Sequence, residues 1–320
     1  MVSLPIPRHL LRSLAGALAA FSLAACAISG SESAARTPAP ASGWPGIVSA
    51  ADPRAADAGV AILRAGGTST DAAIATMLAL GIGGGGFYVR GTAAGEIETL
   101  DGRETAPAAA KPDWFLDPQG QPRGFREAVM SGLSVGVPGN LSLAAKAHAE
   151  HGKLAWAQLF QPAIRLARDG FAITPRLHEM LATFRDTGGF DPAGRALFYD
   201  GAGQPLPVGT VVKNPALAAT LDKIAKKGPA AFYSGENAKA VAGRVSAATP
   251  HPAGMSEADM AAYSAKERPP VCATYRIYRI CGMGPPSSGG ITVIAILKQL
   301  ERFDLKALGK DSPVAWHRFA

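Results

Sequence analysis

Apolar side chains recur at helical spacing along most of the chain, and glycine and proline interrupt them. The pattern predicts a helix over residues 53–65, which Asp52 caps and two glycines end. A second helix of small side chains is expected over residues 71–80, with Ser69 or Thr70 as its cap. Further helices are expected over residues 140–170, 215–226, 236–247, 256–263 and 291–303.

Two pairs of short β-type segments lie among these helices. Residues 87–90 and 96–100 flank a glycine-containing turn, and residues 271–274 and 278–282 form a second pair. Each pair predicts a β-hairpin, and in the second hairpin Cys272 and Cys281 would face each other. Since helices precede and follow paired strands, we expect a mixed α/β or α+β layered fold.

The N-terminus has the pattern of an export signal. Arg8 and Arg12 precede an apolar stretch from Leu14 to Ala25 that is too short to span a bilayer as a mature helix. The stretch ends at Cys26 in the sequence Leu-Ala-Ala-Cys, which resembles the bacterial lipobox. Residues 1–25 are therefore expected to be a lipoprotein signal peptide, with Cys26 lipidated; an ordinary cleaved signal is the alternative.

A tether and a cell-envelope location follow from this interpretation. Residues 26–43 are rich in Ser, Ala and Pro and lack the apolar side chains needed to fold, so we expect them to link the anchor to a domain over residues 44–320. Ala27 replaces the aspartate that usually retains lipoproteins in the inner membrane. The expected place is thus the periplasmic side of the envelope, lipid-anchored in the outer membrane.

The distribution of charge and the number of cysteines limit the classes of function that are expected. The formal charge is +7, but Lys226-Lys227 is the only adjacent basic pair, so the charge is dispersed and nucleic-acid binding is not expected. Apart from Cys26, the chain has the even pair Cys272 and Cys281, which is compatible with a disulfide or with two free thiols in an exported protein. No motif indicates a cofactor or a metal.

Candidate chemistry lies around a run of four glycines, residues 83–86, and the segment Asp-Gly-Arg-Glu-Thr-Ala-Pro at residues 101–107. The glycine run lacks the spacing of a phosphate-binding loop and indicates a tight turn between ordered elements. The fork of Arg103 suits a carboxylate, although a surface arginine paired with Asp101 or Glu104 is the simpler local interpretation.

The serine-containing segment at residues 285–290, Pro-Pro-Ser-Ser-Gly-Gly, lacks the Gly-x-Ser-x-Gly pattern of a nucleophile elbow. Its simpler interpretation is a helix start capped by Ser287 or Ser288.

The order of the motifs is more specific than any one of them. They include the helix at residues 52–67, the glycine run, the Arg103 segment and later segments at residues 134–139, 228–235, 263–268 and 285–290. In this order they closely resemble the large subunit of the γ-glutamyltranspeptidase family, from about Gly46 to the end of the printed sequence.

The resemblance implies an α+β fold of the N-terminal-nucleophile hydrolase type, an αββα sandwich of which this chain would be the large-subunit part. In that family a precursor cleaves itself, and a threonine at the N-terminus of a small subunit attacks γ-glutamyl amides such as glutathione. The arginine that matches Arg103 holds the α-carboxylate of the γ-glutamyl group. The implied partners are thus the small subunit and a γ-glutamyl substrate.

Two departures from the family pattern shape our expectations. The family's Val-Val-Glu-Pro-(His or Gln)-Ser-Ser-Gly segment is absent, since Leu80 meets Gly81 directly. The sequence also stops at Ala320 before the family's threonine, and Thr292 lies in a predicted helix without the required context. We therefore expect a truncated or separately encoded large subunit that is inactive alone. A non-catalytic lipoprotein that binds γ-glutamyl compounds or peptides, and a related β-lactam acylase, are the alternatives.

Overall fold

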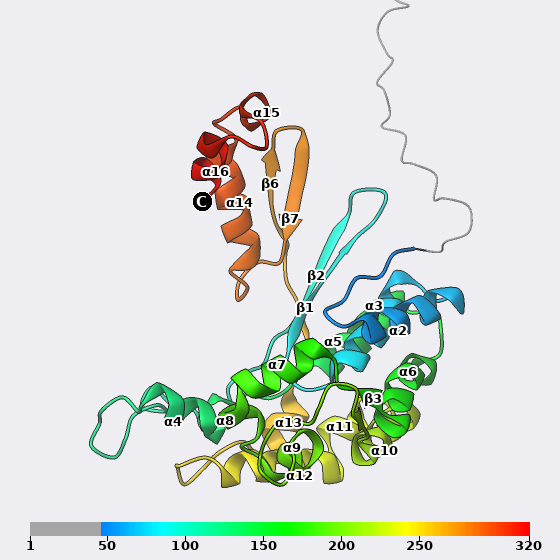
Figure 1. The fold of residues 1–320 in the computed structure, drawn as a ribbon, viewed down its shortest axis with the longest axis vertical. Helices are drawn as coiled ribbons and strands as arrows, with labels where there is room; N and C mark the ends of the chain where they lie inside the picture. Colours follow the sequence, from blue (N-terminus) through cyan, green and yellow to red (C-terminus); the bar gives the residue numbers. More distant parts are fainter. Residues whose placement is uncertain (1–45) are drawn as a thin grey trace, which may run out of the picture. The chain divides into compact units, whose positions relative to one another are not determined.

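The computed structural model describes residues 46–320. Residues 1–45 lie outside the described part, so the predicted signal peptide, Cys26 and the whole of the predicted tether receive no structural account. The helices are α2 (Pro53–Arg64), α3 (Ser69–Leu80), α4 (Phe125–Met130), the 3-10 turn η1 (Gly132–Ser134), α5 (Asn140–His151), α6 (Trp156–Asp169), α7 (Pro175–Thr183), α8 (Arg185–Gly188), α9 (Pro192–Phe198), α10 (Pro215–Lys227), α11 (Ala230–Tyr233), α12 (Gly235–Ala247), α13 (Glu257–Ala262), α14 (Gly289–Leu300), α15 (Leu305–Leu308) and α16 (Pro313–Phe319) (Figure 1).

The strands form three small antiparallel sheets. β1 (Gly86–Gly91), β2 (Ile97–Gly102) and β5 (Lys266–Glu267) make a three-stranded sheet with β2 in the middle. β3 (Phe171–Ala172) pairs with β4 (Val211–Val212), and β6 (Val271–Tyr275) pairs with β7 (Tyr278–Gly282). Both predicted hairpins are present, and the predicted α+β class is confirmed.

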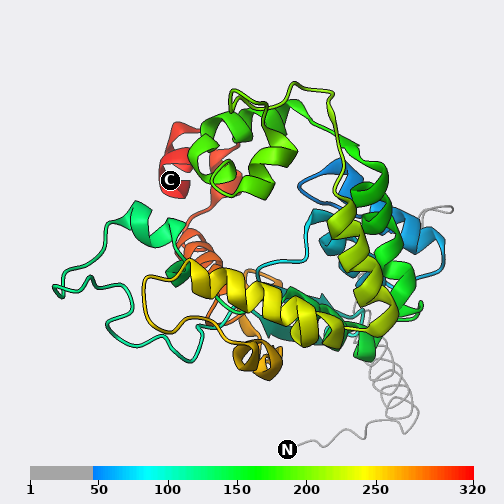
Figure 2. The same cartoon turned by 90° about the horizontal axis from the view of Figure 1, so that it is seen from below.

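The hydrophobic core lies among the helices, and the β1–β2 hairpin, called the central hairpin below, packs on one of them. α2 packs on α3, and α6 packs on both α3 and α10; Figure 2 shows α6 and α10 side by side as the green and yellow-green helices. Phe160 and Leu159 of α6, Leu141 of α5 and Leu221 of α10 are fully buried in this cluster. α5 also packs on β1 and β2, and this contact fixes the hairpin from which the site is built.

The starts of α2 and α3 follow helix-capping rules, with one correction. Asp52 caps α2 as predicted and pairs with Arg54, whose hydrogen bonds lower the pKa of the Asp52 carboxyl below its usual value. The expectation that Ser69 or Thr70 caps α3 is wrong. Thr68 is the cap, because its hydroxyl accepts from the Asp71 backbone N–H while the Asp71 carboxylate accepts from the Thr68 N–H.

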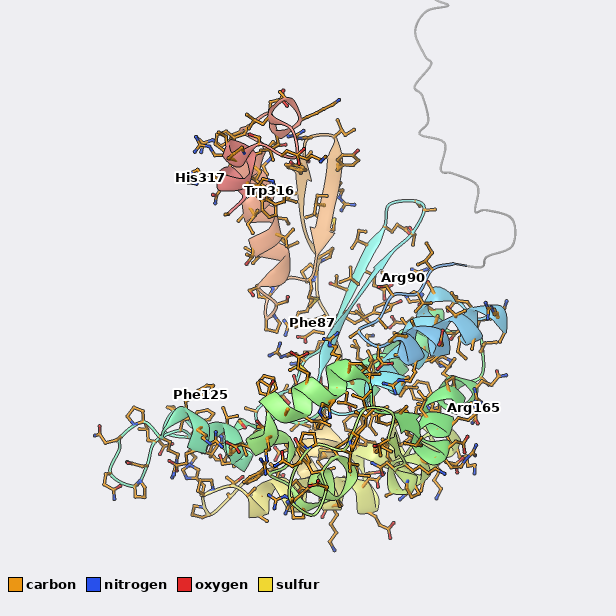
Figure 3. All side chains as sticks on the ribbon, in the orientation of Figure 1. Phe87, Arg90, Phe125, Arg165, Trp316 and His317 are labelled. Atoms are coloured by element: carbon orange, nitrogen blue, oxygen red, sulfur yellow. A yellow bond between two sulfur atoms is a disulfide. The ribbon has the colours of Figure 1, made fainter. Side chains whose placement is uncertain are left out.

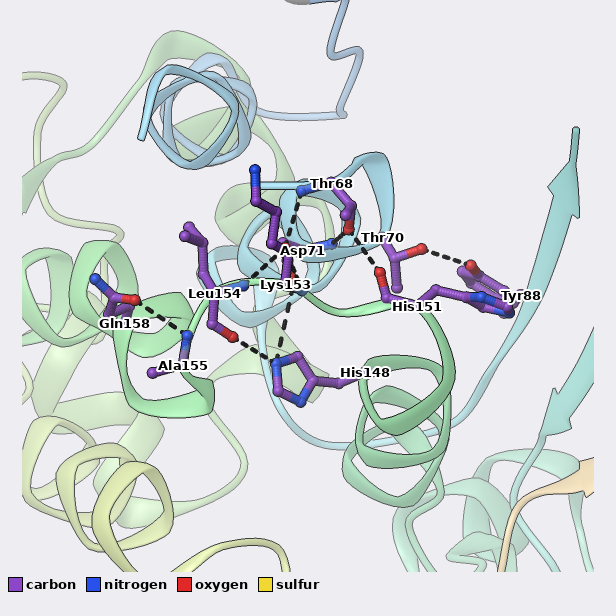
Figure 4. A network of polar contacts seen from close by, with 10 residues as sticks. All are labelled: Thr68, Thr70, Asp71, Tyr88, His148, His151, Lys153, Leu154, Ala155 and Gln158. Atoms are coloured by element: carbon purple, nitrogen blue, oxygen red, sulfur yellow. Dashed lines mark hydrogen bonds and ion pairs between the residues drawn. The ribbon is translucent and has the colours of Figure 1, made fainter. Parts of the chain in front are cut away.

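The single helix expected over residues 140–170 is in fact two helices, α5 and α6. Gly152 ends α5, and a Cβ there would lie 2.6 Å from the carbonyl oxygen of His148. The Asp71 carboxylate then accepts hydrogen bonds from the backbone N–H groups of Lys153 and Leu154, which span the break (Figure 4). A distant buried carboxylate thus satisfies the backbone of a turn that the apolar spacing does not reveal.

Candidate substrate-binding site

Arg103 follows the last residue of β2, at the end of the central hairpin. In the register of β1 and β2, Gly86 lies opposite Gly102, so the glycine run ends beside the arginine segment. A Cβ on Gly85 would lie 2.5 Å from the Gly102 oxygen and 2.6 Å from the Glu104 nitrogen. Gly85 is therefore needed for close backbone approach, as expected for a glycine run between ordered elements.

The carboxylates beside Arg103 have different partners. Asp101 is buried, accepts a hydrogen bond from the Arg103 backbone N–H at 2.9 Å, and pairs with Arg268 Nε at 2.6 Å. Glu104 is the carboxylate that pairs with the Arg103 side chain, through Nε at 3.2 Å. The Arg103 side chain is 59% exposed, and neither of its two Nη groups makes a hydrogen bond within residues 46–320. The fork of the guanidinium is thus open to a ligand carboxylate.

Two stacked tyrosines hold the backbone of the site. The Tyr263 hydroxyl donates to the Arg103 carbonyl at 2.7 Å. Its ring stacks on Tyr233 with centroids 5.9 Å apart, and Tyr233 donates to the Pro138 carbonyl at 2.8 Å. Burial, with the charges of Asp101 and Glu104 as smaller causes, raises the pKa of Tyr263 to about 12. Tyr263 therefore remains protonated, and a hydrogen-bond donor, at neutral pH.

Gly139 completes the close packing around these groups. A Cβ on Gly139 would lie 2.0 Å from the Gly102 oxygen and 2.2 Å from the Tyr263 hydroxyl. The Gly139 N–H also donates to the Gly84 carbonyl at 2.8 Å. Segments that are far apart in the sequence, and that carried the family resemblance, therefore meet around Arg103.

A pocket of about 460 Å³ opens beside Arg103, a volume suited to a small ligand. Of the described residues that line it, Arg103 and Lys111 are the cations and Glu104 is the anion. Trp114 and Val135 contribute apolar surface. The arrangement can bind a carboxylate and an adjacent ammonium group.

A second polar network ties the central hairpin to the helices. The buried Asp71 links the start of α3 to the α5–α6 turn, and Thr70 hydrogen-bonds to Tyr88 of β1 at 2.7 Å (Figure 4). Figure 3 places Phe87 and Arg90 on the same strand. These contacts position β1, and with it the glycine run.

Three side chains in the described part of the chain have the spacing of a metal site. Ligand atoms of Glu98, Glu150 and His151 all lie within 4.8 Å of one another. Arg90 lies 3.8 Å from Glu98, and Lys146 lies 2.8 Å from Glu150. Cations of the protein already face both carboxylates, so we assign this cluster to ion pairing.

The serines at the start of α14 have a structural contact. The Ser287 hydroxyl accepts a hydrogen bond from the Gly289 N–H at 3.2 Å, whereas the Ser288 side chain makes no capping bond. No hydrogen bond of the described residues joins either serine to a histidine. The arrangement therefore lacks the nucleophile–base contact that would make a serine reactive.

The two cysteines predicted to face each other do so. Cys272 and Cys281 are directly opposite in the β6–β7 ladder, with Cα atoms 4.1 Å apart, and the structure joins their Sγ atoms in a disulfide. Cys26 lies outside the described residues. Among residues 46–320, no helix has the length and apolar character needed to cross a membrane.

Three residues of the site were not identified by sequence reasoning. Tyr263 and Arg268 were noted only as the ends of a motif, and Lys111 was not singled out. A local pattern could not reveal them, because the partners of Tyr263 and Arg268 at the site are 160 and 167 residues away in the sequence.

Comparisons with known proteins identify the family of the chain. Residues 55–320 match the family Gamma-glutamyltranspeptidase. The chain is 37% identical over 276 residues to the Glutathione hydrolase proenzyme of Escherichia coli (strain K12), covering 83% of this chain and 47% of that protein. It is 36% identical over 294 residues to the Acylase ACY 1 proenzyme of Pseudomonas sp. (strain V22), covering 88% of this chain and 52% of that protein.

Comparison with solved structures identifies the same family. The crystal structure of Helicobacter pylori gamma-Glutamyltranspeptidase matches with a TM-score of 0.79 and 34% identity, over 86% of this chain and 80% of that chain. The chain spans about half the length of the curated relatives it matches. The expected N-terminal-nucleophile hydrolase fold is confirmed for the part of it that this chain covers, and the chain belongs to the γ-glutamyltranspeptidase family.

Proposed function

We propose that this chain supplies the γ-glutamyl-binding part of a γ-glutamyltransferase or glutathione hydrolase. The observation that carries the proposal is the exposed Arg103 fork beside a pocket, with Nε paired with Glu104 and neither Nη group in a hydrogen bond with a described residue. A substrate α-carboxylate would bind the Nη groups in a two-point contact. The α-ammonium group would bind Glu104.

The remaining residues of the site orient Arg103. Asp101 accepts from the Arg103 backbone N–H and Tyr263 donates to its carbonyl, so the backbone is held on both sides. Because Arg268 takes the buried Asp101 charge, Asp101 does not compete with a substrate for the guanidinium. The site is therefore organised before a ligand binds, which reduces the entropy cost of binding.

The chemical step is proposed to need a partner. In this proposal a small subunit supplies the threonine, whose hydroxyl attacks the γ-carbonyl carbon; the amide C–N bond breaks, and water or an amine then takes the acyl group. An apolar surface supports such a partner, since Ile291, Val293 and Ile296 of α14 are each 43–50% exposed. Trp316 on α16 is also exposed (Figure 3). In this proposal, cleavage of a γ-glutamyl anilide depends on the threonine of that partner.

The lipid anchor is a separate part of the proposal. The lipobox-like sequence at Cys26 supports a chain held at the periplasmic face of the outer membrane by lipid. Mass spectrometry of the mature N-terminus tests it, and an unmodified N-terminus would rule it out. A Cys26→Ser variant should be released from the membrane fraction or remain unprocessed.

A β-lactam acylase is the second candidate function, favoured by the similarity to the Acylase ACY 1 proenzyme. The two candidates make different use of Glu104. A γ-glutamyl group has an ammonium for Glu104 to bind, whereas an acyl group without an amine leaves that carboxylate without a ligand contact.

Calorimetry with three ligands tests the proposed function. Glutathione is compared with an analogue that lacks only the α-carboxylate and one that lacks only the α-amino group. We expect each deletion to weaken binding about tenfold or more, the usual effect of losing a charge-assisted contact. Equal affinity for all three ligands, or no binding of glutathione, would contradict the proposal. Tighter binding of the amine-free analogue would favour the acylase.

A further inference from the structure

The pocket beside Arg103 contains a second cation, Lys111, which the proposed γ-glutamyl contacts do not use. Lys111 is exposed, and no ion pair or hydrogen bond of its ammonium is seen within the described chain. Arg103 and Lys111 line the same pocket, and the anion between them in sequence, Glu104, is already paired with Arg103. The pocket thus has an uncompensated positive charge in addition to its carboxylate fork.

The loop that carries Lys111 is held in place by several contacts. Two successive turns shape it, with Ala110 N–H donating to Pro107 and Trp114 N–H donating to the carbonyl of Lys111, both at 2.9 Å. The Ala108 N–H donates to the Asp259 carboxylate at 2.8 Å. These bonds fix the backbone of Lys111 relative to the pocket wall.

Trp114 fastens the far end of the loop. Its ring is 7% exposed, stacks on His251 with centroids 4.9 Å apart, and donates from Nε1 to the Leu133 carbonyl at 3.0 Å. His251 also contacts the Trp114 carbonyl through Nε2 at 2.9 Å. The loop is therefore anchored at both ends, and Lys111 is presented from a defined position.

We propose that Lys111 binds a second carboxylate, located on the leaving group of the substrate. The inference rests on the proposed function: with the α-carboxylate on Arg103 and the α-ammonium on Glu104, Lys111 is the charged side chain of the described pocket lining that is left for the other end of the ligand. The substrate class is then γ-glutamyl peptides with a free C-terminal carboxylate.

The type of residue fits this role. Lysine carries a compact charge on a flexible four-carbon stem, so it can follow carboxylates at somewhat different distances. Arginine, with its planar fork, defines one geometry for the invariant γ-glutamyl end. Phe115 and Val135 add apolar surface to the lining of the same pocket, which suits an uncharged middle section of the ligand.

Calorimetry with glutathione and its C-terminal amide tests the proposal on the full chain. Wild-type protein should bind the acid about two- to fivefold more tightly than the amide, the range for a partly exposed charge contact. Lys111→Gln should remove this preference and Lys111→Arg should retain part of it. Lys239→Gln, an exposed lysine of α12 outside the pocket, is the matched control and should bind like wild type.

The outcomes separate this inference from the proposed function. Equal binding of acid and amide by wild type, or an unchanged preference in Lys111→Gln, overturns the role of Lys111. If Arg103→Lys weakens both ligands in that case, the proposed function stands without it. If neither ligand binds, or if Arg103→Lys leaves both affinities unchanged, the γ-glutamyl assignment fails and the Lys111 proposal fails with it.

Discussion

Replacing Asp71 should destabilise the fold strongly, because its carboxylate accepts hydrogen bonds from the backbone at the start of its own helix and from the distant turn between α5 and α6. Asp71 is fully buried, and its Oδ2 accepts from the N–H groups of Thr68, Lys153 and Leu154 at 2.9–3.2 Å (Figure 4). Asp71→Ala leaves these three donors without their acceptor. A hydrogen bond to a charged group contributes about 1.5–3 kcal/mol, and water can reach part of this turn. We therefore expect a loss of about 3–5 kcal/mol, less than the simple sum.

Urea unfolding followed by far-ultraviolet circular dichroism measures this effect. With an m-value of about 3 kcal/mol/M, the midpoint should fall by about 1–2 M at unchanged m. Asp71→Asn keeps one oxygen acceptor but loses the charge, so it should cost about 1–2 kcal/mol. Asp57→Ala, an exposed aspartate of α2, is the control and should stay within about 0.5 kcal/mol of wild type. A loss for Asp71→Ala no larger than that of the control would show that the Asp71 carboxylate does not stabilise these backbone groups.

Three further predictions concern the site, the acid stability and the hairpin. Gly139→Ala should lower the unfolding midpoint and weaken glutathione binding, since its Cβ would lie 2.0 Å from a backbone oxygen; Gly243→Ala, with nothing within 4 Å, should be neutral or stabilising by about 1 kcal/mol. The pKa of Asp52 is lowered in the folded state, mainly by its hydrogen bond with Arg54. The ionised carboxylate of Asp52 therefore stabilises the fold at neutral pH, and this stabilisation is lost as the pH falls below about 4. The stability gap between wild type and Asp52→Asn should narrow over that range, and a constant gap would contradict the pKa shift. Cys272 and Cys281 should resist alkylation in the non-reduced protein, and two reactive thiols there would exclude the disulfide.

Local patterns in the sequence were sufficient to locate most of the regular structure. Helical spacing with an Asp-Pro start located α2, and the alternating segments located both hairpins, including the pairing of Cys272 with Cys281. The break between α5 and α6 was missed because apolar spacing continues through it. Its cause is partly Gly152 and partly Asp71, which is more than 80 residues away in the sequence.

In the candidate site too, some residues could be predicted from the local sequence, whereas others are placed only by long-range contacts. Arg103 and the glycine run could be selected from the sequence, because motif order carried a family resemblance that the comparisons confirm. The partner of Asp101 could not, since Arg268 reaches it only through the β2–β5 pairing. Likewise, Lys111 lines the pocket only because its loop is fastened at Trp114, a long-range contact that no local pattern encodes.

A single titration checks whether Arg103 binds the α-carboxylate of a γ-glutamyl ligand. Glutathione binding is measured by calorimetry for wild type, Arg103→Lys and Arg165→Lys, the last an exposed arginine of α6 outside the pocket (Figure 3). Loss of the two-point contact should weaken binding about ten- to a hundredfold in Arg103→Lys, with Arg165→Lys unchanged. Equal affinity of all three proteins for glutathione would contradict the account.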